Sequence, residues 1–170
     1  NLDYKLEDGS TALVYYKSEI EKMDPRNGDL NLPGWDASYK KDELNAVLEK
    51  YKSVSEEDLW NNLKYFLEQI IPVAEEVKIK MAIHPDDPPW PIFGLPRIIT
   101  NEENLDRFLK LYESEYNGLT LCTGSLGVSK DNNMPNMIRR FGKKIHFAHL
   151  RNVKIINDGE FQESAHMSKY

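Results

Sequence analysis

Apolar residues recur at helical spacing most clearly after Ser55. They return every three or four positions and form one predicted stripe, Leu59, Leu63, Phe66, Ile70, Val73 and Val77. Ser55 is placed to cap this helix, with Asp58 at the third helical position, where the helix dipole favours an acid. Pro72 lies inside the stripe and is expected to kink the helix or end its regular hydrogen bonding.

Three shorter helices are also predicted. One covers residues 40–52. A second opens at the capping box Thr100-Asn101-Glu102-Glu103. A third surrounds 134–141, with Gly142 as its expected C-cap.

Runs of alternating apolar residues predict strands over 78–84, over the segment that ends at Cys122, and over 144–150. The sequence Asn117-Gly118 is expected to turn the chain into the second strand, and Asn157-Asp158-Gly159 predicts a hairpin after the third. Helices and strands therefore alternate over this part of the chain, as in a parallel α/β protein.

We divide the single expected domain, 1–170, into three parts. Residues 1–53 are loop-rich with a short helix, 54–153 form successive βα units, and 154–170 form a hairpin and loop. A closed (β/α)8 barrel, the TIM barrel, needs about 200–250 residues. The chain is therefore either a small open sheet or part of a barrel, and the absent initiator Met favours part of a longer polypeptide.

Composition restricts the partners. The net charge is −6 and the basic residues are scattered, which argues against nucleic acid. No apolar run approaches the roughly 20 residues needed to span a membrane, and the start lacks a signal-peptide pattern. The chain has one cysteine and so no internal disulfide, which is typical of the cytoplasm.

Three residues that can bind a metal lie at or near the ends of the predicted strands: His84, Cys122 and His149. Because parallel strands deliver their carboxyl ends to one edge, we expect these side chains to meet there. Imidazole and thiolate bind transition metals, and three protein ligands leave positions open for a substrate. Taken alone, Cys122 is more often a buried core residue, and His84 is as readily structural.

His146 competes with His149 for the third position. The two differ by three residues, so in a regular strand they point to opposite faces. His149 lies nearer the carboxyl end and shares a face with Arg151, and we favour it.

Further polar residues lie close to these strand ends. Arg151 suits a substrate carboxylate, although an ordinary ion pair is the alternative. Asp86 and Asp87 could orient ligands or bind sugar hydroxyls, or only cap the loop backbone. Glu163 and His166 could join the site, or form an exposed pair.

The segments that carry these residues resemble mannonate dehydratase. They read MAIHPDDPPW at 81–90, LTLCTGSLG at 119–127 and IHFAHLRN at 145–152, and the similarity runs over most of the chain. The resemblance implies a metal-dependent (β/α)8 barrel of the xylose isomerase group, of which this chain is part. It also implies conversion of D-mannonate to 2-dehydro-3-deoxy-D-gluconate and water in hexuronate breakdown.

The resemblance also implies that His84, Cys122 and His149 are the metal ligands. Ligand softness alone favours Zn²⁺ or Fe²⁺, whereas the family is described with Mn²⁺ or Fe²⁺, which we adopt. The family has a C-terminal Arg-Pro-Asp-His-Gly-Arg-like segment that supplies a further carboxylate ligand, and this sequence does not contain it.

The remaining roles are assigned as expectations. The predicted substrate-binding residues are Arg151, Asn152 and Asp86, the predicted catalytic residues are Arg151 and His166, and the predicted assembly is a homodimer. The rival functions are a metal-dependent sugar isomerase or epimerase on the same fold, and a non-catalytic fragment.

Overall fold

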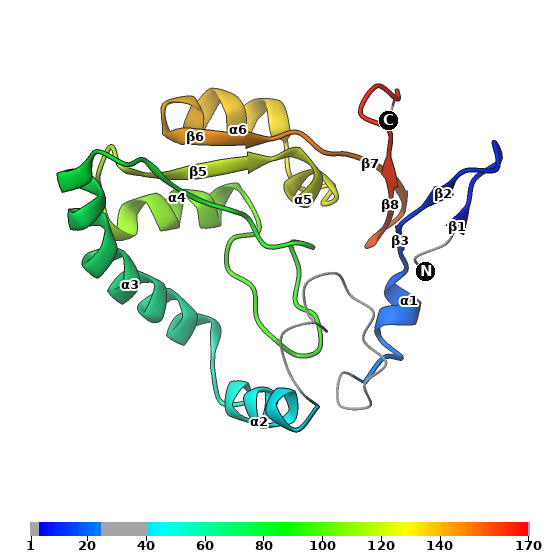
Figure 1. Ribbon diagram of the computed structural model, residues 1–170, viewed down its shortest axis with the longest axis horizontal. Coiled ribbons are helices and arrows are strands. Elements are labelled where there is room, and N and C mark those ends of the chain that lie inside the picture. The colour runs from blue at the N-terminus through cyan, green and yellow to red at the C-terminus, as the bar shows by residue number, and fades with distance from the viewer. Residues whose placement is uncertain (1–3, 25–40, 170) are drawn as a thin grey trace.

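A parallel three-stranded sheet lies in the upper part of the computed structural model as Figure 1 shows it, and the structure describes residues 4–24 and 41–169. Its strands lie in the order β4 (Met81–Ile83), β5 (Asn117–Cys122) and β6 (Ile145–His149). Both pairings are parallel, so the predicted succession of parallel βα units is confirmed for this part of the chain. The described fold is thus mixed α/β.

Helices pack against one face of this sheet. They are α3 (Glu56–Val77), α4 (Glu102–Leu111), α5 (Thr123–Gly127) and α6 (Met134–Phe141), the last continued by the 3-10 turn η2 (Gly142–Lys144). The core between sheet and helices contains Trp60, Leu67, Ile71, Ile98, Ile99, Leu105, Phe108, Leu119, Leu126, Met137 and Phe141.

The start of α3 is as predicted, but its buried face is not. Ser55 and Asp58 form a reciprocal capping box. The fully buried residues of the helix are Trp60, Leu67, Ile71 and Ala74, whereas three members of the predicted stripe are more than half exposed, namely Phe66, Val73 and Val77. The helix is apolar over more than one face. The spacing of its apolar residues therefore predicted a stripe of which only part packs against the core.

Pro72 does not end α3, contrary to one of the two expected outcomes, since the helix continues to Val77. Pro72 is exposed, and so is Glu68, whose carbonyl loses its i+4 partner. The missing hydrogen bond therefore lies on the solvent side of the helix, where water can replace it.

Several element boundaries differ from the prediction. The first strand begins at Met81, because Lys78 takes a left-handed conformation as the C-cap of α3. The N-cap of α4 is Asn101 and not Thr100. Asn117-Gly118 belongs to β5 itself, and residues 123–127, which contain two glycines and would be typical of a loop, form α5.

The rest of the described chain forms smaller units. Helix α1 is Lys17–Ile20, and α2, predicted over 40–52, is Lys41–Tyr51. An antiparallel sheet contains β3 (Val14–Tyr15), β8 (Glu160–Ser164) and β7 (Asn152–Asn157), and β1 (Tyr4–Lys5) pairs with β2 (Thr11–Ala12). The predicted hairpin is confirmed, with Gly159 at a positive φ of 71°. The loop-rich part expected over 1–53 includes residues 1–3 and 25–40, which lie outside the described residues.

No helix within the described ranges is both long and apolar enough to cross a bilayer.

Candidate metal centre

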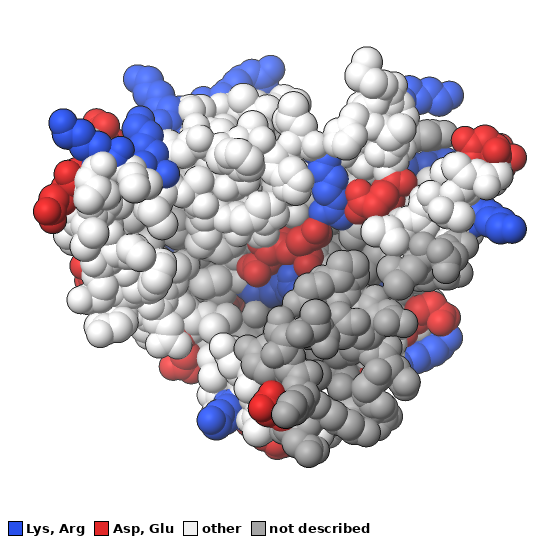
Figure 2. Space-filling view, in the orientation of Figure 1, with Lys and Arg blue, Asp and Glu red and all other residues white. Residues whose placement is uncertain are grey.

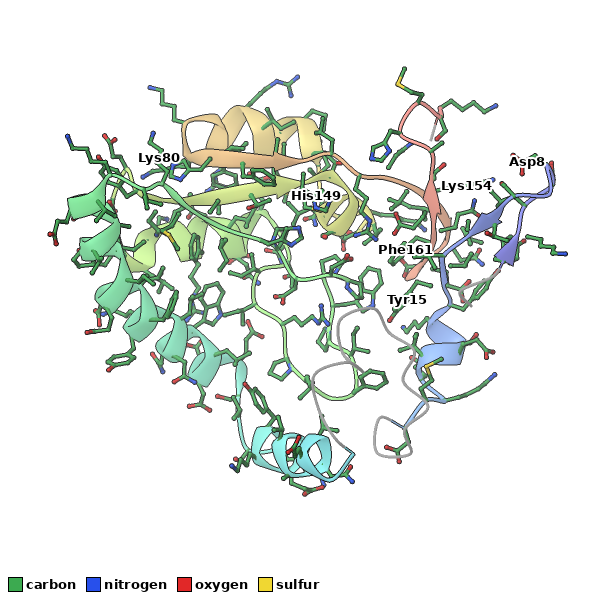
Figure 3. The ribbon with its side chains drawn as sticks, viewed as in Figure 1. Asp8, Tyr15, Lys80, His149, Lys154 and Phe161 are labelled. Atoms are coloured by element: carbon green, nitrogen blue, oxygen red, sulfur yellow. The ribbon has the colours of Figure 1, made fainter. Side chains whose placement is uncertain are left out.

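His84, Cys122 and His149 meet at the carboxyl edge of the parallel sheet. One ligand atom from each lies within 4.8 Å of the others. His84 Nε2 is 3.1 Å from His149 Nδ1, and Cys122 Sγ is 3.4 Å from the same nitrogen. Figure 3 shows His149 at the end of β6, beside α5 and at the opposite end of the sheet from Lys80. The structure thus brings together the three residues that the sequence selected.

Two of these residues share a sheet face by simple alternation. Met81 and Leu119 pack into the helix-side core, so Ala82 and Gly118 point to the other face. His84 and Cys122 follow at even steps on the same side as Ala82 and Gly118.

His149 reaches that face through an irregularity in β6. Leu119 pairs with Ile145, but Thr120 pairs with Phe147, so β6 uses two residues where β5 uses one. Ile145 packs against the core, and in a regular strand His149, four residues further on, would share its face. The bulge at His146 shifts the alternation by one and sets His149 opposite Cys122.

The expectation that His146 and His149 point to opposite faces is therefore wrong. The His146 ring crosses Gly118, and its Nδ1 lies 2.6 Å from the carbonyl oxygen of Met81. Because a carbonyl only accepts, Nδ1 donates. The His146 side chain is thus hydrogen-bonded to β4, two strands away from β6, near the end of the sheet opposite the ligand cluster.

We expect Gly118→Ala to lower the free energy of unfolding by about 1–3 kcal/mol. A β-carbon there would lie 2.4 Å from the His146 ring and 2.5 Å from the carbonyl oxygen of Lys144, which is backbone and cannot swing aside. Chemical denaturation measures the change. Gly127→Ala, with nothing within 4 Å of its new β-carbon, is the matched control and should be no less stable than the parent. Equal stabilities for the two variants would contradict the close approach.

The donor set fits a transition metal ion. With metal–nitrogen bonds near 2.1 Å and metal–sulfur bonds near 2.3 Å, neighbouring ligands stand about 3–3.5 Å apart. The separations of 3.1 and 3.4 Å lie in this range. His84 Nδ1 donates to the carbonyl oxygen of Pro85 at 2.8 Å, so the neutral ring keeps the Nε2 lone pair for the cluster.

Asp86 caps the loop backbone, as one of its predicted alternatives has it, and its binding of a substrate hydroxyl stays a prediction. Its Oδ2 accepts from the backbone N–H groups of Ile98 and Ile99, at 3.0 and 2.8 Å. Its own N–H donates to the carbonyl oxygen of Ile99. Asp86 therefore fixes both ends of the proline-rich loop that follows His84.

Arg151 forms a partly buried ion-pair network. It donates to both carboxylate oxygens of Glu163 from Nε, at 3.0 and 3.1 Å, and pairs again with Glu163 through Nη2 and with Asp87 through Nη1. Figure 2 shows acidic and basic side chains in contact near the middle of the displayed face, with other basic side chains scattered around its rim.

Burial alone would lower the pKa of Arg151, but the hydrogen bonds that it donates to Glu163 and the charges of Asp87 and Glu163 outweigh burial and hold the pKa above its usual value. Gly124 gives the side chain room, since a β-carbon there would lie 2.5 Å from Arg151 Cδ. All three guanidinium nitrogens are engaged with protein carboxylates, so the ion-pair alternative accounts for the contacts seen. Binding of a substrate carboxylate stays a prediction.

Arg151→Lys is expected to cost about 1–3 kcal/mol of stability, because lysine keeps the charge but cannot bridge two carboxylates with a planar fork. The midpoint of urea unfolding measures the loss. Arg139→Lys, at an exposed position of α6, should stay within about 0.5 kcal/mol. If the Arg151 and Arg139 variants unfold together, the network does not contribute to stability.

The other two predicted site residues contact the C-terminal turn. Asn152 Nδ2 donates to the carbonyl oxygen of Ala165 and to Ser168 Oγ, and His166 Nε2 lies 3.0 Å from the carbonyl oxygen of Leu150. His166 is exposed. Neither residue has a recorded contact with the three candidate ligands within the described ranges, and their roles stay predictions.

Sequence reasoning missed the residues that surround Cys122. The thiol is completely buried, and Ser125 contacts it through both its hydroxyl and its backbone N–H. Thr123 exchanges hydrogen bonds with the backbone of Arg151 through its hydroxyl. The only signal for these contacts was the position of these residues directly after the cysteine.

Comparison with known proteins gives consistent matches. The family model described as D-mannonate dehydratase (UxuA) matches residues 1–170. The chain is 58% identical over 170 residues to mannonate dehydratase 2 of Halalkalibacterium halodurans, with 99% of this chain and 49% of that protein covered. It is 51% identical over 170 residues to the mannonate dehydratase of Oceanobacillus iheyensis, with 100% and 49% covered.

A solved structure matches as well. The crystal structure of mannonate dehydratase from Streptococcus suis serotype 2 superimposes with a TM-score of 0.84 at 45% identity, with 99% of this chain and 45% of that chain covered. The chain therefore spans about half the length of the relatives it matches.

Proposed function

This chain belongs to the D-mannonate dehydratase family, and we propose that it carries the metal-binding part of a hydro-lyase. The reaction is loss of water from D-mannonate to give 2-dehydro-3-deoxy-D-gluconate. The observation that supports it is the convergence of His84, Cys122 and His149 at the ends of three neighbouring parallel strands. Ligands on successive strand ends, with helices on the opposite face, favour a (β/α)8 barrel for the whole protein.

The ion proposed for this site is Mn²⁺ or Fe²⁺, held by the two imidazoles and the thiolate. When bound, such an ion supplies Lewis acidity to the carboxylate and hydroxyl groups of a hydroxy acid, which acidifies the neighbouring C2–H. With three ligands from this chain, further positions stay open for a substrate or for additional protein groups.

The chain's own residues would bind and orient the sugar acid. Arg151 would direct its fork toward the C1 carboxylate, which then competes with Asp87 and Glu163 for the same donors. Asn152 has its amide nitrogen occupied, so its side-chain oxygen would accept from a substrate hydroxyl. Asp86 is proposed to accept from another hydroxyl.

Elimination needs one proton removed and one delivered. The C2 proton passes to a general base, the C3 hydroxyl departs as water with a proton from a general acid, and the resulting enol becomes the ketone. His166 is proposed for one of these transfers, because it is exposed and an imidazole can both accept and donate a proton.

We expect metal removal to abolish turnover in the purified full-length protein. A chelator should take activity to background, and readdition of Mn²⁺ or Fe²⁺ should restore it together with about one equivalent of bound metal. Mass spectrometry of the product identifies the reaction class. Loss of one water and a 2-keto-3-deoxy acid support the dehydratase. A product of unchanged mass indicates an isomerase or epimerase, and no turnover in a metal-loaded protein indicates a binding role.

A homodimer in the cytoplasm is proposed for the whole protein. The single cysteine, buried in the candidate metal site, suits a reducing compartment. Size-exclusion chromatography with light scattering tests the assembly.

A further inference from the structure

Ser125 lies directly against the sulfur of Cys122. It is fully buried, its Oγ is 3.1 Å from Cys122 Sγ, and its backbone N–H donates to the same sulfur at 3.3 Å. Helix α5 begins immediately after β5, with Cys122 as its N-cap. The first turn of α5 therefore places Ser125, the third residue after Cys122, next to the sulfur.

The chemistry of a cysteine ligand decides which atom donates in the hydrogen bond between Ser125 Oγ and Cys122 Sγ. A cysteine binds a metal as the thiolate, which has no proton to donate. The Oγ–H of Ser125 must then be the donor, and the recorded partner of that hydroxyl within the described residues is Cys122 Sγ. Two donors from one residue thus point at one sulfur, in a setting without solvent exposure.

We propose that Ser125 is a positioning residue that tunes the Cys122 thiolate, an inference that rests on the proposed metal site. Two hydrogen bonds withdraw electron density from the sulfur and fix its direction toward His84 and His149. A sulfur with less electron density to donate behaves as a harder ligand, which reduces the advantage of soft ions over Mn²⁺ or Fe²⁺. Ser125 thereby adjusts the metal preference of a site whose donor set alone favours softer ions.

Substitution of the serine in the full-length protein tests this, with Co²⁺ as a spectroscopic probe. The sulfur-to-cobalt charge-transfer band reports the electron density on the thiolate. In Ser125→Ala we expect the band to move to longer wavelength and the Mn²⁺ affinity to fall about 10-fold, at unchanged metal stoichiometry. Affinity for Zn²⁺ should fall less, so the ratio of Zn²⁺ to Mn²⁺ affinity rises.

The control is Ser129→Ala, a serine just beyond α5 with no recorded contact to Cys122. Its charge-transfer band should coincide with that of the parent. If Ser125→Ala also leaves the band and both affinities unchanged, Ser125 only fills space. The inference about Ser125 is then overturned, while the proposed metal site still stands. If the parent protein itself gives no sulfur charge-transfer band with Co²⁺, the proposed metal site fails and the inference falls with it.

Discussion

Metal content is expected to fall to background in Cys122→Ser and in His149→Ala. Each change would remove one of the three proposed ligands, so the metal affinity should drop by more than about 100-fold, beyond the 10–100-fold typical of residues that only support a ligand. D-Mannonate turnover should fall by about 1,000-fold or more, because the Lewis acid contributes several kcal/mol to the transition state. Elemental analysis and a keto-acid assay on the full-length protein provide both readouts.

His166→Ala separates binding from catalysis in the same experiment. It should keep the full metal content while turnover falls, since its recorded contact is with the Leu150 carbonyl and not with the cluster. Retention of both metal and activity in Cys122→Ser would return the cysteine to the role of an ordinary buried side chain.

Deletion of Ala148 is expected to remove the proposed metal site while leaving the strand in place. Ala148 lies between the bulge and His149, so its loss would set His149 opposite Leu121 instead of Cys122 and move every later side chain to the other face. His149 would then point toward the helices, and metal affinity should fall by the same 100-fold or more. Deletion of His146 is the matched control, because it removes only the extra residue of the bulge and leaves His149 opposite Cys122, so metal affinity should stay within about 10-fold of the parent.

Metal titration with circular dichroism on both variants distinguishes misdirection from unfolding. A folded Ala148 deletion variant that binds metal like the parent would show that the pairing of β6 with β5 does not orient His149. The comparison is matched, because each variant lacks one residue of the same strand.

Much of this arrangement could be predicted from local chemistry. The capping box at Ser55, the hairpin at Gly159 and the three candidate ligands all depend on residues close in sequence, or on the rule that parallel strands end at one edge. The bulge at His146 could not be predicted in this way. Its neighbours Ile145 and Phe147 are ordinary strand residues, and no glycine or proline marks the irregularity.

Helix α5 could not be predicted from the sequence for a different reason. A five-residue segment with two glycines is typical of a loop. It becomes a helical turn because Cys122 caps it and Leu126 is completely buried beneath it. Likewise the partners of Arg151 depend on how the hairpin folds back, which brings Glu163 beside it.

The closure of the proline-rich loop by Asp86 has a mechanical consequence. Three hydrogen bonds tie Asp86 to Ile98 and Ile99, and both isoleucines are held in the core. The two ends of the segment between them are thus held together, and doubling the length of such a loop costs only about 0.6 kcal/mol. An insertion between these ends would lengthen the loop without moving His84, which lies outside it.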